Sequence, residues 1–232
     1  FLYRTSSDLY SYYTDLGWYG KQTQVVARCF GGSEKTGMGW DGVDYNTAYG
    51  IDGADRRYNP AGEYTLVGSN GEDSVAYYDN QTDNYSQLHA QLSLYHRFSS
   101  QWSLTATAHY THGYGYYEQY KKKSFSYWGL PCYTDARGNE IKKAYGLYRK
   151  HLNNHFYGGI VSAKYISEAI DIQIGGAANH YMGAHYGTLH HLQDSLYGGS
   201  IPVQYEYYRN NADKVDANIY SKLNWRILQK GK

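Results

Sequence analysis

The stretch SQLHAQLSLYHRFSSQWSLTATAHYT, residues 86–111, alternates apolar and polar residues on both sides of a short polar break at 99–101. Because successive side chains of a β-strand point to opposite faces, this period of two predicts two strands joined by a tight turn. Strands of soluble proteins usually run about 5–6 residues, whereas these extend over 86–98 and 102–111. Such lengths suit tilted strands that cross a lipid bilayer.

The composition is dominated by tyrosine and glycine. The 232 residues include 31 Tyr but 5 Phe, with 26 Gly and 3 Pro, and the mean hydropathy is −0.74. No apolar run approaches the ~18 residues of a transmembrane helix, so no helical membrane span is predicted. Tyrosine combines an apolar ring with a hydroxyl that binds water, which suits the aromatic girdles of a membrane β-barrel. A soluble tyrosine-rich β-protein is the alternative on composition alone.

Five further segments have a similar period of two, which gives seven predicted strands, over 8–19, 22–31, 86–98, 102–111, 155–165, 170–181 and 215–227. Three connections are short turns, near Gly20, Ser100 and Ser167. Every second connection is a long loop, at 32–83, 114–153 and 182–213. A compact soluble domain rarely carries even one structureless loop beyond about 15 residues. The alternation in connection length therefore favours an all-β fold, an antiparallel up-and-down transmembrane β-barrel.

The alternation assigns each strand residue to one of two faces. We expect the apolar set to face lipid: Leu88, Leu92, Leu94, Leu104, Ala106, Ile172, Ile174, Ile219 and Leu223. We expect the polar set to line a wet lumen: Gln87, His89, Gln91, Thr105, Thr107, Gln173, Asn218 and Lys222. In a soluble sandwich the polar set would face bulk water, so the pattern alone does not decide. Seven strands leave two long unpaired edges, so we expect further strands to complete a larger barrel.

The sequence carries no recognisable catalytic motif. It lacks a P-loop, GxSxG, HExxH and paired CxxC, so we expect no enzymatic activity, no catalytic residue and no cofactor. Four histidines gather near one predicted strand end, namely His180, His185, His190 and His191. No cysteine or firm carboxylate ligand accompanies them, so we expect no metal site.

Charge and cysteine content argue against a nucleic-acid-binding protein and against a disulfide-stabilised fold. The formal net charge is +1, and the absence of a strongly basic balance argues against nucleic acid as a partner. Cys29 falls in a predicted strand and Cys132 in a long loop, and two cysteines so placed give no disulfide framework.

The predicted long loops carry aromatic side chains that could bind a bulky solute at a pore mouth. They are Trp40, Tyr45, Tyr49, Tyr114, Tyr116, Tyr117, Trp128 and Tyr186. Packing of the loops against one another is the alternative. Because loops carry exposed groups on a rigid scaffold, any solute contact should come from these loops and from lumen residues near their bases. The sequence assigns no individual ligand-binding residue.

Several stretches resemble the TonB-dependent outer-membrane receptors of Bacteroidetes, and the resemblance runs through nearly all of the chain. They are GMGWDGV (37–43), DRRYNPAGEY (55–64), YYDNQTDNYSQLHAQL (77–92), FSSQWSLTATAHYTHGYGYYEQYK (98–121), NNHFYGGIVSAKY (153–165) and YEYYRNNADKVDANIYSKLNW (205–225). The stretch HYTHGYGYYEQYK after FSSQWSL is the most diagnostic of them.

The resemblance implies a 22-stranded barrel with an N-terminal plug domain in its lumen. Residues 1–232 would be the middle of that barrel, a partial barrel domain without the plug or the TonB box. It further implies a bacterial outer-membrane location and import of a scarce bulky solute such as an iron–siderophore complex, haem or cobalamin.

The partners implied are the lipid bilayer, the solute at the extracellular loops and the inner-membrane TonB–ExbB–ExbD complex, reached through the absent N-terminal part. A surface lipoprotein is a further candidate partner. A structural or adhesive outer-membrane barrel and an importer of glycans are the alternative functions.

Overall fold

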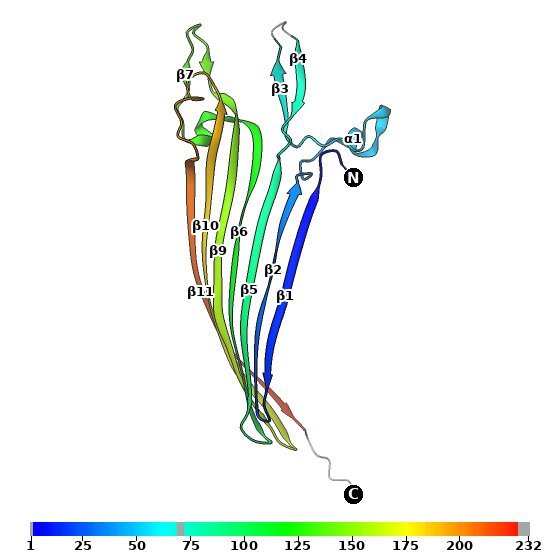
Figure 1. Cartoon of the computed structure of the whole chain (residues 1–232), viewed down its shortest axis with the longest axis vertical. Helices are drawn as coiled ribbons and strands as arrows, with labels where there is room; N and C mark the ends of the chain where they lie inside the picture. Colours follow the sequence, from blue (N-terminus) through cyan, green and yellow to red (C-terminus); the bar gives the residue numbers. More distant parts are fainter. Residues whose placement is uncertain (1, 69–71, 227–232) are drawn as a thin grey trace.

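One long, curved β-sheet forms the body of the molecule (Figure 1). The structure, a computed structural model, describes residues 2–68 and 72–226. Within these residues seven strands form the main sheet, and every neighbouring pair is antiparallel, in the order β1-β2-β5-β6-β9-β10-β11. The strands are β1 (Ser7–Tyr19), β2 (Thr23–Gly37), β5 (Thr82–Arg97), β6 (Trp102–Ser124), β9 (Lys143–Ile166), β10 (Ile170–Gln193) and β11 (Tyr205–Trp225). The predicted antiparallel all-β fold and its up-and-down order are confirmed.

Short turns lie at one end of the sheet and long insertions lie at the other (Figure 1). The turns are closed by backbone hydrogen bonds from Gly20 N to Thr23 O (2.8 Å), Phe98 N to Trp102 O (3.0 Å) and Ser167 N to Ile170 O (2.7 Å). The opposite end, called the loop end below, carries the short elements. They are α1 (Tyr45–Tyr49), η1 (Ile51–Gly53), β3 (Glu63–Val67), β4 (Asp73–Tyr77), η2 (Phe125–Trp128), β7 (Tyr133–Thr134) and β8 (Glu140–Ile141). The predicted alternation in connection length is thus confirmed.

The strands extend further toward the loop end than the sequence pattern predicts. Six segments that we expected to lie in loops belong to the main strands, namely 32–37, 82–83, 114–124, 143–153, 182–193 and 205–213. The predicted loops 32–83, 114–153 and 182–213 are therefore wrong in their bounds, and the connections between the main strands are 38–81, 125–142 and 194–204. Aromatic, polar and charged side chains occupy both faces here, as in Tyr116-Tyr117, so the period of two disappears while backbone pairing continues. The predicted strand residue Ile227 lies outside the described residues.

Few side chains of the sheet are buried. Of the described residues, the buried apolar cluster comprises Phe125, Trp128, Ala144, Tyr148, Leu189 and Leu192, and all of them lie at the loop end. Along the middle of the sheet large apolar side chains are exposed, for example Leu16 (78%) and Ile219 (88%). None of the helices in the described part of the chain is long and apolar enough to span a membrane.

Candidate functional site

The strand register divides the middle of the sheet into an apolar face and a polar face. Directly opposed residues of an antiparallel pair share a face, so one cross-sheet row of the apolar face can be followed strand by strand. It runs Trp18, Val25, Leu94, Ala106, Val161, Gly176 and Ile219. The next row toward the loop end runs Leu16, Ala27, Leu92, Ala108, Gly159, Ala178 and Ala217. All nine residues predicted to face lipid lie on this apolar face, and all eight predicted lumen residues lie on the polar face.

Aromatic side chains border the apolar face on both sides. Toward the turns lie Trp18, Trp102, Tyr165 and Trp225, with the rings of Trp102 and Tyr165 4.9 Å apart. Toward the loop end, Tyr110 and Tyr157 are directly paired. The step from Trp102 to Tyr110 along β6 measures about 27 Å at about 3.4 Å per residue. The apolar face is therefore bordered by aromatic side chains toward the turns and, on β6 and β9, toward the loop end, where the same row carries Thr14, Cys29, Ala90 and Val215 on β1, β2, β5 and β11.

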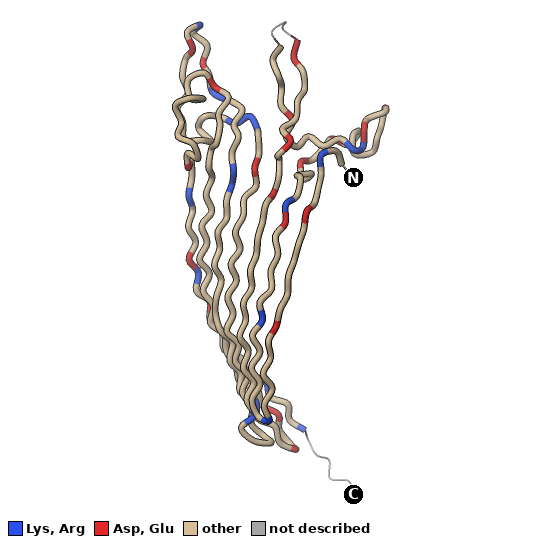
Figure 2. Tube along the Cα trace, in the orientation of Figure 1, with Lys and Arg blue, Asp and Glu red and all other residues tan. Residues whose placement is uncertain are grey.

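A row of hydrogen-bonding groups crosses the polar face at mid-height. It runs Asp15, Arg28, Gln91, His109, Gly158, Asn179 and Asp216. His109 Nε2 lies 3.0 Å from Asn179 Oδ1, and Asn179 Nδ2 donates to Asp216 Oδ1 at 3.4 Å. The central strands β5, β6, β9 and β10 carry no Lys, Arg, Asp or Glu at mid-height, whereas β1, β2 and β11 carry Asp15, Arg28, Asp213, Lys214 and Asp216 (Figure 2).

Gly158 makes the contact between His109 and Asn179 possible. Those two residues lie on β6 and β10, and β9 runs between them with Gly158 at this level. A Cβ atom at position 158 would collide with Asn179 Oδ1 and with the carbonyl oxygen of Ala178. The missing side chain therefore lets a polar contact reach across an intervening strand.

The loop end is tied to the sheet by a buried carboxylate. Glu118 projects from β6 with a side chain that is 3% exposed. It accepts hydrogen bonds from Tyr78 Oη (2.5 Å), Asn80 Nδ2 (2.5 Å) and Arg149 Nε (2.6 Å). Burial by itself raises the pKa of Glu118, but the hydrogen bonds and the Arg149 charge outweigh it, and the net pKa is lowered. Burial and the bond to Glu118 raise the pKa of Tyr78 to about 12.

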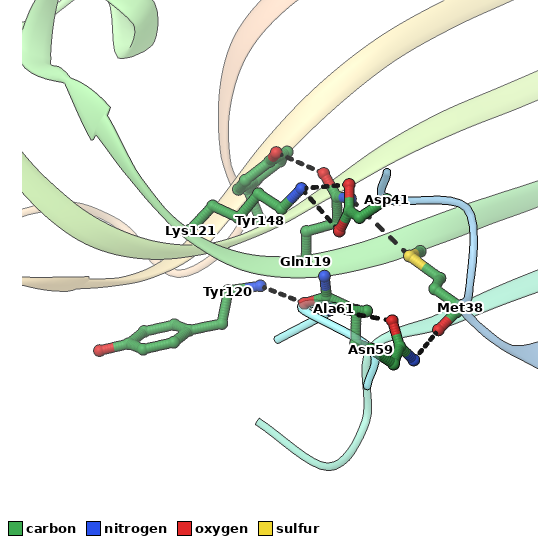
Figure 3. A network of polar contacts seen from close by, with 9 residues as sticks. Met38, Asp41, Asn59, Ala61, Gln119, Tyr120, Lys121 and Tyr148 are labelled. Atoms are coloured by element: carbon green, nitrogen blue, oxygen red, sulfur yellow. Dashed lines mark hydrogen bonds and ion pairs between the residues drawn. The ribbon is translucent and has the colours of Figure 1, made fainter. Parts of the chain in front are cut away.

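A second polar network fixes the connection after β2 (Figure 3). The buried Asn59 donates to Met38 O at 2.8 Å, and its side-chain oxygen accepts from Ala61 N at 3.1 Å. Gln119 Nε2 lies 3.7 Å from Met38 Sδ, and Tyr148 Oη donates to Gln119 Oε1 at 2.6 Å. These contacts hold the entry of the long connection 38–81 against β6 and β9.

The same network includes an ion pair. Lys121 Nζ lies 2.9 Å and 3.0 Å from the two carboxylate oxygens of Asp41 (Figure 3). Backbone Tyr120 N also donates to Gln81 Oε1 at 3.2 Å. The start and the end of the connection 38–81 are therefore both bound to β6.

Half of the aromatic residues predicted to lie in loops are in strands. Tyr114, Tyr116, Tyr117 and Tyr186 belong to β6 and β10, so the loop assignment is wrong for them because the strands continue beyond the alternating region. Trp128 is fully buried, which agrees with the alternative that aromatic residues of the loops pack against one another. Trp40, Tyr45 and Tyr49 do lie in the connection 38–81 and are exposed.

The four clustered histidines lie along β10 and not in a loop. His180 pairs with Tyr157 on the apolar-face side, whereas His185 pairs with Leu152 on the opposite face. Among the described residues, no group of three or more His, Cys, Asp or Glu side chains is placed to hold a metal ion. Cys29 and Cys132 are both free thiols in this part of the chain.

Two features of the site were not predicted from the sequence. The first is the burial of Glu118, whose partners Tyr78 and Asn80 come from a different segment of the chain. The second is a groove of about 490 Å³ on the polar face of β1, β2 and β5. The alternation of apolar and polar residues in the sequence assigns Phe30 and His89 each to a face of its strand. Only the strand register shows that these two groove residues lie directly opposite one another.

No protein-family model matches the chain, and a search of curated proteins finds no matching sequence.

Proposed function

We propose that the chain is a wall segment of an outer-membrane β-barrel that belongs to a TonB-dependent receptor. In this proposal the apolar face meets lipid and the polar face lines the lumen. The loop end lies outside the cell and the short turns lie in the periplasm. Further strands pair with the outer edges of β1 and β11 and close the barrel.

One observation carries the membrane assignment: an apolar face, bordered by aromatic side chains, extends about 27 Å along the strands, which is about 21 Å along the membrane normal at a strand tilt of about 40°. Transmembrane barrels have an outward apolar band about 25 Å tall with aromatic girdles at both interfaces. Large exposed apolar patches on a protein surface mark contacts with lipid or with another protein. A band that follows all seven strands at one level suits lipid, because a bilayer has the same thickness at every strand.

Small residues on the polar face support its place on the inside. Five of the seven residues in one row of that face are small; the row runs Ser11, Gly32, Gln87, Gly113, Asn154, Gly183 and Ala212. The side chain of Tyr85 lies over Gly113, and that of Tyr181 lies over Gly183. Side chains crowd together on the concave side of a curved sheet, and glycines relieve that crowding.

The transport function rests on the resemblance to TonB-dependent receptors. On that basis the barrel imports a scarce bulky solute of the iron–siderophore, haem or cobalamin class. The energy comes from an inner-membrane TonB complex. The structural support is indirect: the loop end contains a buried apolar cluster and the hydrogen-bonded Glu118, in accord with a surface that presents a fixed shape to a solute.

Fractionation and uptake together test the proposal. We expect the full-length protein in the outer-membrane fraction, extractable only with detergent, with a gel mobility that changes on heating. Removing the β7–β8 hairpin tip, residues 133–141, should lower solute uptake and leave the heat-modifiable barrel intact. Recovery from the aqueous fraction without detergent would contradict the membrane assignment. Normal barrel behaviour without any uptake activity would favour a structural or adhesive barrel.

A further inference from the structure

A groove lined by aromatic rings lies on the polar face near the loop end. Its volume is about 490 Å³ and it spans β1, β2 and β5. The floor is formed by the backbone at Gly32, where no side chain fills the space. The lining side chains on this face are Leu9, Ser11, Tyr13, Phe30, Glu34, Tyr85, Gln87 and His89. This combination joins apolar ring faces with a single charged group.

The rings of the groove are held in place by their neighbours. Phe30 and His89 are directly paired across β2 and β5 and stack with centroids 4.5 Å apart and planes 10° apart. His89 Nδ1 lies 3.0 Å from Thr111 Oγ1, which fixes the orientation of the imidazole. The ring of Tyr13 lies 6.1 Å from that of Phe30. The groove therefore offers preformed π surfaces.

The charge next to these rings is negative. Glu34 is directly opposite Tyr85, and Asp83 lies two residues before Tyr85 on the same face. Burial and then the charge of Glu34 raise the pKa of Asp83. Within the described residues neither carboxylate has an ion-pair partner within 4.0 Å. Glu34 and Asp83 are therefore not engaged in ion pairs, although Lys150 lines an adjoining pocket together with Asp83 and Tyr85.

The basic side chains Arg28 and Lys150 lie on the same face but contact or oppose residues other than Glu34. Arg28 is directly opposite Asp15, one step nearer the turns than Phe30 on this face. Lys150 Nζ lies 5.9 Å from the ring centre of Tyr117 and 5.7 Å from that of Tyr127. The end of the groove near Glu34 is thus left with ring faces and carboxylates.

We propose that this groove binds an organic cation, an alkylated ammonium group held against Tyr13, Phe30 and Tyr85 and paired with Glu34. The face of an aromatic ring is negative, so it attracts a cation, and quaternary ammonium groups bind to clusters of such rings. A nearby carboxylate adds Coulombic attraction. The inference rests on the proposed function in one respect, since it takes the polar face to be the one that meets solutes. The groove would then select for a positively charged part of the solute.

Choline and its neutral isostere 3,3-dimethylbutan-1-ol are the probes that test this inference. We expect saturation-transfer NMR on the full-length protein in deuterated detergent to detect choline binding, with the neutral isostere about tenfold weaker or more. Glu34→Gln should reduce choline affinity by a similar factor. Phe30→Leu, which keeps an apolar side chain but removes the ring, should reduce the preference for the cation.

Matched controls separate this inference from the membrane proposal. Glu168→Gln removes an exposed carboxylate in the turn after β9, and Phe98→Leu removes an exposed ring near the turns. Both should leave choline binding unchanged. Equal binding of the two probes, or unchanged choline affinity in Glu34→Gln, would overturn the inference, as would binding of neutral sugars in place of choline. Heat-modifiable mobility, measured on the same samples, reports on the barrel independently of any probe.

Discussion

The middle of the sheet and its loop end differ in how their apolar side chains are removed from water. At the loop end, Trp128 is buried among Tyr148, Leu189 and other residues of the chain itself, and Glu118 has three hydrogen-bond donors. In the middle, Leu92 and Ile219 are exposed, and nothing in the described residues covers them. The loop end buries an apolar cluster within the chain itself, whereas the middle requires an apolar environment supplied from outside the chain.

The largest effect is expected from the substitution Trp128→Ala at the loop end. Truncating a fully buried tryptophan removes its packing and leaves a cavity, at a cost of about 4 kcal/mol. Hydrogen exchange should show faster opening of η2 and of the adjoining ends of β9 and β10, with no change in the middle of the sheet. Trp40→Ala, at an exposed position, should change stability by less than about 0.5 kcal/mol. Similar losses for both variants would contradict the separation of the two regions.

A charge on the apolar face should have the next largest effect, and only in lipid. Leu92→Arg should destabilise the folded protein by about 2–4 kcal/mol in a bilayer, because arginine near the midplane loses its hydration. The neighbouring substitution Gln91→Arg points to the polar face and should cost far less. The measurement is reversible unfolding of the full-length protein in lipid vesicles. Equal costs at 91 and 92 would mean that the apolar face does not meet lipid.

Glu118→Gln should have a smaller effect, because the amide keeps the shape of the side chain but loses the charge. We expect a loss of about 1.5 kcal/mol from the weakened bond to Arg149. Since the pKa of Glu118 is below its ordinary value of 4.5, the wild-type advantage should be present above that value and disappear as the pH falls below it. Glu140→Gln changes an exposed carboxylate and should be nearly neutral. The readout is chemical denaturation of the loop end as a function of pH.

The effect that is smallest at neutral pH concerns His151, because it develops only in acid. Burial, followed by the charge of Arg149, lowers its pKa to about 4, whereas the unfolded chain has the ordinary value of 6.5. The unfolded state therefore binds more protons between those two values, and stability should fall as the pH drops from 6.5 to 4. In His151→Gln this dependence should be weaker, while His185→Gln, at an exposed position, should leave it unchanged. Thermal unfolding at several pH values measures it.

Sequence alone predicts the middle of the sheet and fails at the loop end, for one physical reason. Between residues 88 and 94 the two faces differ in polarity, so the alternation and the turn positions define both strands and faces. Beyond Tyr114 both faces carry aromatic and polar groups, and the extensions of β6, β9 and β10 leave no periodic signal. The burial of Glu118 and the groove around Phe30 depend on contacts between distant segments, which no local pattern encodes.

Accessibility of single cysteines along β5 tests the central claim most directly. In full-length protein with Cys29 and Cys132 replaced by serine, each residue from 87 to 94 is changed to cysteine, labelled with a fluorophore and placed in vesicles. We predict that labels at 88, 90, 92 and 94 are quenched by nitroxides in the lipid acyl chains. Labels at 87, 89, 91 and 93 should instead be quenched by aqueous iodide. Iodide quenching at all eight positions, or the reverse alternation, would contradict a lipid-facing apolar face.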